Sequence, residues 1–286
     1  MSDTQDIERT RRPIGVFDSG LGGLTVVREL ARTMPTEDIV YLGDSARVPY
    51  GIKSLETIRR FAREDASFLL QFDPKLIVVA CNTASAAAIG PLQATLPVPV
   101  VDVITPGAQA AVDATEEAIG VIATGATVES GAYQRAIRRL DERRQVLAAA
   151  CPLLVPIVEE GRSEEDPIVL HVLCDYLRDL QRERPGALIL GCTHYPLLAD
   201  AIGKLMGPET RLINSGRAAA EAVRQELTAA GLARTDAHRA SLRCFTTDNP
   251  DRFSRLGRRF GGREIDEVHY VGTDELESPL PYEIEP

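Results

Sequence analysis

The sequence predicts an α/β fold of two pseudo-symmetric, parallel-rich α/β domains, with helices on both faces of each sheet. Short apolar runs alternate with amphipathic helical patterns from residue 13 almost to the end, which is typical of repeated βαβ units. One run leads into Cys81 within residues 75–85 (KLIVVACNTAS), and another leads into Cys192 within residues 187–196 (ALILGCTHYP). Open α/β sheets bind ligands at the carboxyl ends of their strands. Two matched thiols at two such ends therefore predict one site with a sulfur on each side.

The first half of the chain is a regular succession of strands and helices. Ser54 is suited to cap a helix, since apolar residues follow it at helical spacing and Glu56 lies in the first turn. The predicted elements are, in order, a strand at 13–18, a glycine-rich turn at 19–23, a helix at 24–34, a strand at 39–43, a loop at 44–53, a helix from 55 to about 72, a strand leading into Cys81, an alanine-rich helix to about 96 and a strand at 98–104.

The second half repeats this succession. The predicted elements are a helix at 107–114, a strand at 119–124, a helix at 128–140, a strand at 146–150, a proline-rich segment at 151–161, a helix at 166–183, the strand leading into Cys192, another helix, a strand at 211–214, a helix at 217–230, a strand at 241–246, a helix at 250–260 and a strand at 264–271. Residues 1–12 and the acidic, proline-containing tail at 272–286 are expected to be loose. Pro97, Pro99 and Pro106 bracket one crossing between the halves, and Ser215-Gly216 marks a return crossing.

Composition excludes several classes of protein. The net charge of −10 argues against general nucleic-acid binding. No apolar run is long enough to span a membrane, and the polar N-terminus lacks the apolar core of a secretory signal. Five cysteines without paired spacing indicate free thiols in a reducing compartment, so we expect a cytoplasmic protein.

The paired cysteines suit acid–base or nucleophilic chemistry. A single buried cysteine is usually a small packing residue, and Cys151, Cys174 and Cys244 are interpreted in that way. A thiolate is favoured by a neighbouring imidazole, and His194 lies two residues after Cys192. Hydroxyl, amide and N-terminal N–H groups after both strands could hold a carboxylate, and Glu159 lies in an apolar stretch that should bring it near the interior.

Cofactor chemistry has little support in the sequence. The turn Ser19–Gly23 invites a dinucleotide-binding interpretation, but Thr25 stands at the last glycine of the G-x-G-x-x-G pattern, and Asp18 would repel a phosphate. Asp18 is better suited to accept a hydrogen bond from an ammonium group or to set the charge state of Cys81. No ligand spacing supports zinc, and no lysine has a pyridoxal motif. We therefore expect no metal and no organic cofactor.

Together these motifs resemble the glutamate racemases, cofactor-independent enzymes of the aspartate/glutamate racemase superfamily. The matching segments run in family order and comprise residues 14–23 (IGVFDSGLGG), 41–44 (YLGD), 49–51 (PYG), 81–85 (CNTAS), 156–159 (PIVE) and 191–196 (GCTHYP). The resemblance implies a discontinuous first domain of residues 1–104 and 217–286, a second domain of residues 105–216, and an active site in the cleft between them.

The resemblance also implies a reaction and roles for residues. Cys192 would take the α-proton from L-glutamate and Cys81 from D-glutamate, with Asp18 and Glu159 assisting on one side and His194 on the other. The implied substrate-binding residues are Asp18, Ser19, Pro49, Tyr50, Gly51, Asn82, Thr83, Thr193 and His194. D-glutamate would be made for peptidoglycan, and a homodimer is expected.

Three alternatives remain open from the sequence alone. The first is a racemase of another acidic amino acid, such as aspartate. The second is a noncatalytic amino-acid-binding or regulatory protein. The third is a thiol hydrolase, which would need only one of the two cysteines.

Overall fold

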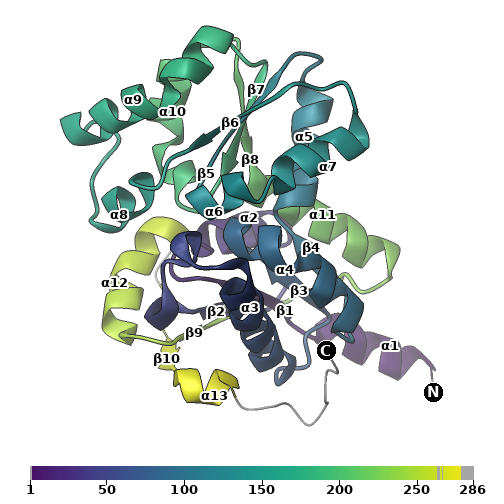
Figure 1. The fold of residues 1–286 in the computed structure, drawn as a ribbon. Helices are drawn as coiled ribbons and strands as arrows, with labels where there is room; N and C mark the ends of the chain where they lie inside the picture. The colour runs from purple at the N-terminus through teal and green to yellow at the C-terminus, as the bar shows by residue number, and fades with distance from the viewer. Residues whose placement is uncertain (1, 263–264, 266, 278–286) are drawn as a thin grey trace.

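The computed structural model describes residues 2–262, 265 and 267–277, and in this part of the chain the strands form two parallel sheets. The first sheet has the order β10-β9-β2-β1-β3-β4 and the second the order β6-β5-β7-β8. Figure 1 shows the two sheets in separate lobes, here called the first and the second domain. The strands are β1 (Ile14–Asp18), β2 (Ile39–Gly43), β3 (Leu76–Val79), β4 (Val100–Asp102), β5 (Ile119–Ala123), β6 (Val146–Ala150), β7 (Ala187–Gly191), β8 (Arg211–Asn214), β9 (Leu242–Thr246) and β10 (Val268–Tyr270).

Helices follow the strands in the alternation that the sequence predicts. The α-helices are α1 (Ser2–Arg11), α2 (Leu24–Thr33), α3 (Leu55–Leu70), α4 (Asn82–Thr95), α5 (Ile104–Ala114), α6 (Gly125–Glu129), α7 (Ala132–Leu140), α8 (Leu154–Glu159), α9 (Pro167–Glu183), α10 (Ala199–Met206), α11 (Ser215–Ala229), α12 (Pro250–Gly261) and α13 (Thr273–Glu277). Short 3₁₀ helices are η1 (Ser45–Arg47), η2 (Tyr50–Ile52) and η3 (Tyr195–Leu198). None of the helices in the described ranges has the length and apolar character needed to cross a bilayer.

The central strands are buried along their whole length because both faces of each sheet are covered. In β1, Val16 packs into the core beneath α2, α11 and α12, whereas the next residue, Phe17, packs into the core beneath α3 and α4. This opposite placement follows from the two-residue period of a strand. In the second domain, α5 and α7 cover one face of the sheet, and α9 and α10 cover the other. The predicted fold class is confirmed.

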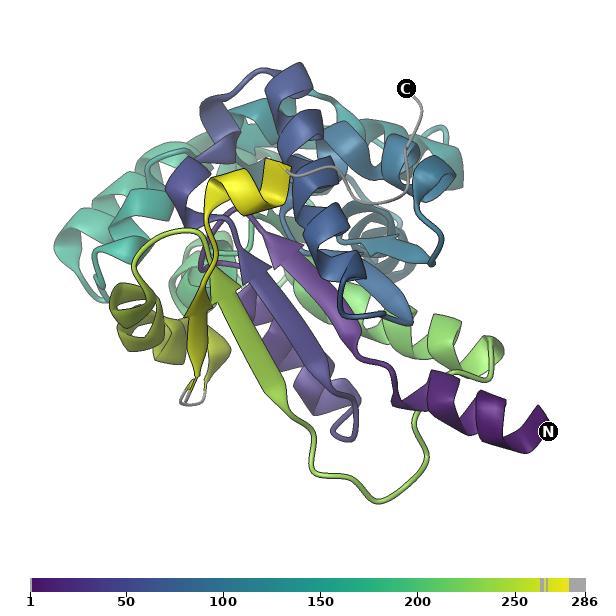
Figure 2. The same cartoon turned by 90° about the horizontal axis from the view of Figure 1, so that it is seen from below.

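The last two strands in the described part of the chain, β9 and β10, belong to the first sheet. Strand β9 pairs with β2, and β10 pairs with β9, both in parallel (Figure 2). These pairings place the last strands beside the first ones. We propose the domain boundaries implied by the resemblance, with residues 1–104 and 217–286 in the first domain and residues 105–216 in the second.

The predictions for the N-terminus and for one helix were wrong. Residues 2–11 form α1 rather than a frayed end, and the Lys75 ammonium ties this helix to the body of the protein by donating to the Thr10 carbonyl at 2.7 Å. The helix predicted at 128–140 is two helices, α6 and α7, because Gly131 adopts a left-handed φ of 66° between them.

Three further segments differ from expectation. The proline-rich segment at 151–161 contains α8, which accommodates Pro156 because the first-turn N–H groups of a helix have no partner within it. The strand predicted at 264–271 is confined to β10, with residues 264 and 266 outside the described residues. The tail begins with α13, whose Leu276 is buried, so residues 273–277 are not loose. Residues 278–286 lie outside the described residues.

A buried ionic network holds the loop after β2. The Arg47 guanidinium donates to Asp44 at 2.6 Å, to Asp65 on α3 at 3.0 Å, and to Glu64. The Tyr50 hydroxyl donates to Asp44 at 2.5 Å and also contacts Asp65 at 2.9 Å. Burial, and then the neighbouring Asp44 charge, raise the pKa of Asp65 well above its ordinary value. The Arg47 charge therefore stabilises two buried carboxyl groups and fixes the loop against α3.

Replacing Arg47 should destabilise the fold. We expect Arg47→Met to lower the free energy of unfolding by about 3 kcal/mol, because it removes the buried positive charge beside Asp44 and the hydrogen-bond donor to Asp65. Urea denaturation measures this loss. The control is Arg60→Met, since the Arg60 guanidinium lies 3.8 Å from Glu64 with its side chain 56% exposed. The control should cost no more than about 0.5 kcal/mol, and equal losses in the two variants would refute the role given to Arg47.

Candidate active site

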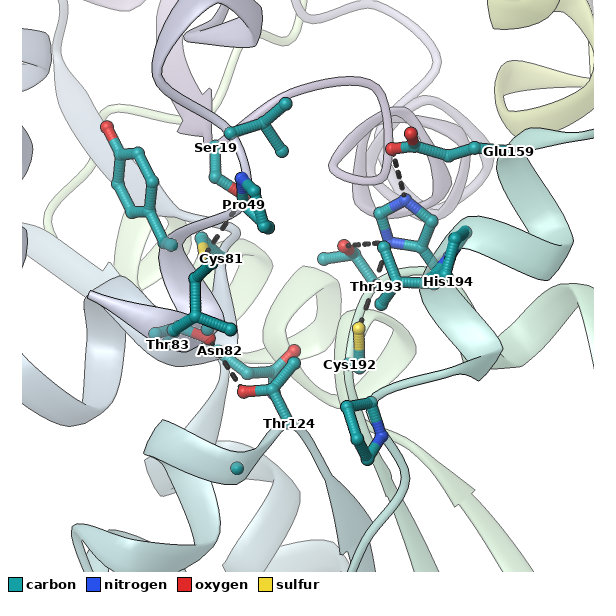
Figure 3. Close-up of a pocket in the computed structure, with 18 residues that line it drawn as sticks. Ser19, Pro49, Cys81, Asn82, Thr83, Thr124, Glu159, Cys192, Thr193 and His194 are labelled. Atoms are coloured by element: carbon teal, nitrogen blue, oxygen red, sulfur yellow. Dashed lines mark hydrogen bonds and ion pairs between the residues drawn. The ribbon is translucent and has the colours of Figure 1, made fainter.

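A cavity of about 320 Å³ lies between the two domains (Figure 3). From the first domain it is lined by Ser19, Val48, Pro49, Tyr50, Gly51, Ile52, Cys81, Asn82 and Thr83. From the second domain it is lined by Thr124, Gly125, Pro152, Val155, Pro156, Glu159, Cys192, Thr193 and His194. All the site residues predicted from the sequence are among these, except Asp18.

The two cysteines occupy corresponding places in the two sheets. Cys81 follows β3 and caps α4, its Sγ accepting from the Ala84 N–H at 3.4 Å. Cys192 follows β7. Figure 3 shows the two residues on different walls of the cavity, Cys81 beside Ser19 and Cys192 beside His194. The two cysteines are 111 positions apart in the chain, yet each lies at the carboxyl end of a strand, which is where open α/β sheets bind ligands.

Cys81 lies in surroundings that favour the neutral thiol. Its side chain is buried, with the Ser19 hydroxyl 3.7 Å from Sγ. Burial, and then the nearby Asp18 charge, raise the pKa of Cys81 to about 12. At neutral pH Cys81 is therefore an un-ionised thiol.

Cys192 lies next to a cationic imidazole. Its Sγ is 3.8 Å from His194 Nδ1, and His194 Nε2 is 3.1 Å from Glu159 Oε1. Burial by itself lowers the pKa of His194, but the contacts with Cys192 and Glu159 outweigh this and raise it to about 10. Burial likewise opposes ionisation of Glu159, yet the hydrogen bond and charge of His194 lower the pKa of Glu159. An imidazolium–carboxylate pair therefore stands beside the Cys192 sulfur.

The structure corrects the expected grouping of the assisting residues. The resemblance implied that Glu159 assists on the same side as Asp18, with His194 on the other side. Glu159 is bonded to His194 instead, because α8 lies between β6 and α9 in the second domain and brings Glu159 to the Cys192 wall.

Asp18 lies beneath the glycine-rich turn and does not line the cavity. Its side chain is fully buried, and Oδ2 accepts from the Gly20 N–H at 3.0 Å. Burial raises the pKa of Asp18 above its ordinary value. Among the described residues, Oδ1 has no hydrogen-bond partner. The predicted effect of Asp18 on the charge state of Cys81 agrees with the raised pKa of Cys81, and the hydrogen bond predicted between Asp18 and a substrate ammonium group stays a prediction.

The glycine-rich turn allows a close approach between the domains. A Cβ atom on Gly22 would lie 2.2 Å from Thr193 Oγ1 and 2.6 Å from the His194 ring, so only glycine fits there. The Thr25 hydroxyl, in the next helix, lies 2.9 Å from the Thr193 carbonyl and can donate to it. These glycines therefore seat the Cys192 loop against α2, which leaves the dinucleotide-binding interpretation without support.

Thr124 was missed in the sequence analysis. It follows β5 directly, and its hydroxyl lies 3.0 Å from Thr83 Oγ1 across the domain interface and 3.0 Å from Thr127 Oγ1. Its position at the carboxyl end of a predicted strand could have identified it, as this position identified the two cysteines.

Two of the expected binding side chains are already engaged. The Asn82 amide donates to the Tyr133 hydroxyl at 2.8 Å and lies 3.4 Å from Ser215 Oγ. The Tyr50 hydroxyl belongs to the Arg47 network. Tyr50 can therefore contact a ligand only through its ring or main chain.

The remaining cysteines and the possible metal ligands lie outside this arrangement. Cys151 and Cys244 are buried packing residues, as predicted, whereas Cys174 is exposed, contrary to prediction. Within the residues described, no group of three or more His, Cys, Asp or Glu side chains is placed to hold a metal ion. Chemically, the cavity offers a thiol on one wall and a cysteine beside an imidazolium on the other.

Known proteins are similar to this chain over most of its length. The family model described as Asp/Glu/Hydantoin racemase matches residues 14–223. A glutamate racemase of Geobacter metallireducens is 45% identical over 265 residues, which cover 92% of this chain and 97% of that protein.

Solved structures give the same result. A glutamate racemase isoform from Bacillus anthracis superposes with a TM-score of 0.88 at 41% identity, covering 92% of this chain and 98% of that one. The glutamate racemase of Francisella tularensis, solved in complex with D-glutamate, superposes with a TM-score of 0.86 at 39% identity, covering 93% of this chain and 99% of that one. The two parallel sheets, the cysteine at the end of one strand in each and the matches over most of the chain lead to one conclusion: this chain belongs to the Asp/Glu/hydantoin racemase family.

Proposed function

We propose that this protein interconverts L- and D-glutamate without a cofactor, using Cys81 and Cys192 as the acid–base pair. The observation that supports the proposal is that these two cysteines line opposite walls of one cavity in different surroundings, Cys81 near the buried Asp18 and Cys192 beside the His194–Glu159 pair. Glutamate is the substrate favoured by the relatives, which are glutamate racemases at 39–45% identity.

In the L-to-D direction, the Cys192 thiolate removes the α-proton and the Cys81 thiol protonates the opposite face of the carbon. One C–H bond breaks and another forms, so the substrate is neither oxidised nor reduced. The enzyme is left with a Cys192 thiol and a Cys81 thiolate. This form either converts D-glutamate back or exchanges protons with solvent to recover the starting form.

The carbanion that forms between the two steps needs stabilisation by fixed donors. The N-terminus of α4 lies directly after Cys81 and offers the main-chain N–H groups of Asn82 and Thr83. Thr193 lines the other wall. These groups are positioned to bind a substrate carboxylate and to stabilise the charge that spreads into it as the proton leaves.

The proposed cellular setting follows from the chemistry. Both cysteines must stay reduced to exchange protons, which suits the cytoplasm. There the product would supply D-glutamate for peptidoglycan. The homodimer expected from the resemblance stays a prediction, which sedimentation velocity can test.

The first test is incubation of the purified protein with L-glutamate in D₂O without added cofactor. We expect optical rotation to decay to zero while deuterium enters at Cα. L-aspartate serves as the second substrate. Turnover of aspartate alone would replace glutamate by aspartate in the proposal, and turnover of neither would leave a noncatalytic binding protein.

Both cysteines should be required. We expect Cys81→Ser and Cys192→Ser each to lower kcat/KM by about 10³-fold or more, because an alcohol is a much weaker acid than a thiol. Circular dichroism should show an unchanged fold. Cys174→Ser, at an exposed cysteine, is the matched control and should keep nearly full activity. If one serine variant stays fully active, a single-nucleophile hydrolase becomes the better hypothesis.

The His194–Glu159 pair should make stability depend on pH in a defined window. The pKa of His194 is raised from 6.5 to about 10, so its contribution is complete below pH 6.5 and is lost as pH rises through 10. The pKa of Glu159 is lowered from 4.5, so its contribution is present above pH 4.5 and is lost at lower pH. Between these limits we expect Glu159→Gln to cost about 2 kcal/mol.

Thermal melts of the wild type and Glu159→Gln from pH 4 to pH 10 measure this effect. The difference in Tm should be largest between pH 4.5 and 6.5 and should shrink towards pH 10. A difference that grows at alkaline pH would contradict a protonated His194.

A further inference from the structure

Helix α12 of the first domain is hydrogen-bonded to the segment of the second domain that carries Glu159. Arg259 Nη1 donates to the Val158 carbonyl at 3.1 Å, and its Nη2 donates to the Arg162 carbonyl. These two carbonyls lie on either side of Glu159 in the sequence. On the same helix, Phe260 packs edge-on against the His194 ring, with centroids 5.3 Å apart and planes at 82°. Figure 1 shows α12 beside α8, at the boundary between the two domains.

Helix α8 is anchored in the core by Leu154 and Val158, whereas Glu159 and the turn after it lie at the end of the helix. It is six residues long, far below the length at which an isolated helix is stable. After it the chain turns at Gly161, whose φ of 84° is unsuited to other residues. The Glu159 carboxylate nevertheless meets His194 at 3.1 Å, which requires the Val158–Arg162 backbone to be held in place. The guanidinium of Arg259 supplies two fixed donors there, and cations favour the carbonyl end of a helix.

We propose that Arg259 is a positioning residue for the proton transfer at Cys192. By holding the carbonyls of Val158 and Arg162, it keeps Glu159 against His194, and so keeps the imidazolium beside Cys192. These two hydrogen bonds form only when α12 and α8, which belong to different domains, lie against each other. They therefore link the assembly of the Cys192 wall to the relative position of the two domains. This inference rests on the proposed racemase function.

An isotope experiment can separate this role from a general loss of structure. The equilibrium constant between enantiomers is one, so kcat/KM must be equal in the two directions for every variant. A slower proton transfer at Cys192 therefore lowers kcat/KM equally in the L-to-D and D-to-L directions, so comparing the two values does not reveal it. It is visible in deuterium isotope effects, because Cys192 removes the α-proton of L-glutamate and Cys81 removes that of D-glutamate.

The variants are Arg259→Gln and Arg259→Lys. Arg255→Gln is the matched control, since Arg255 is an exposed arginine on the same helix. We expect Arg259→Gln to lower kcat/KM by about 10- to 100-fold, the size of effect seen when a catalytic group is misplaced by about 1 Å. Arg259→Lys should lose less, because an ammonium keeps the charge but cannot present a planar pair of donors. The control should stay within about twofold.

The decisive readout is the isotope effect on kcat/KM with α-deuterated L- and D-glutamate. In Arg259→Gln the effect with L-glutamate should rise, since the Cys192 step limits the rate. The effect with D-glutamate should fall towards its equilibrium value, since the Cys81 step then precedes the slow one. Reduced activity with unchanged isotope effects would overturn the proposal and give Arg259 a purely structural role. Unchanged activity would also overturn it, whereas a wild type without racemase activity would refute the proposed function instead.

Discussion

The site depends on a close approach between the two domains at the glycine-rich turn after β1. Gly22 leaves no room for a side chain against Thr193 and His194, and Thr25 reaches the Thr193 carbonyl from the same segment. This contact seats the loop after β7 against the first domain. Because Cys81 belongs to the first sheet and Cys192 to the second, the cavity has two opposed sulfurs only when the domains meet in this way.

The two walls of the cavity differ in their electrostatics although their topology is similar. On the Cys81 wall, burial and a buried carboxyl group disfavour a thiolate. On the Cys192 wall, the His194–Glu159 pair brings a positive charge to the sulfur. The reaction proposed for this site is symmetric, but the site itself is not, because a buried thiol on one wall faces a cysteine beside an imidazolium–carboxylate pair on the other. The asymmetry arises outside the matched strands, from Asp18 on one side and from α8 on the other.

The elements around the cavity are held by arginine hydrogen bonds that sequence patterns do not predict. The Arg47 network fixes the loop that lines the cavity with Pro49 and Tyr50. The Arg259 side chain holds the segment around Glu159. Arg47 reaches Asp65, 18 residues away, in addition to the nearby Asp44, and both partners of Arg259 are about 100 residues away, so no spacing rule identifies these contacts. Such contacts are the physical reason that the bonding of the Tyr50 hydroxyl and the pairing of Glu159 with His194 could not be predicted, while the role of Tyr50 in substrate binding stays a prediction.

The sequence alone determined the βαβ succession, the strand boundaries of β2, β6 and β8 and the identity of both cysteines, because local periodicity and strand-end position encode these features. Only the tertiary structure decided that Glu159 pairs with His194, that Asp18 is sealed beneath the turn, and that Thr124 joins the cavity. Lys75 and Arg259 also bind main-chain carbonyls of α1 and α8 from distant segments. Long-range hydrogen bonds and burial depend on how the domains meet, and this information is absent from any local stretch of sequence.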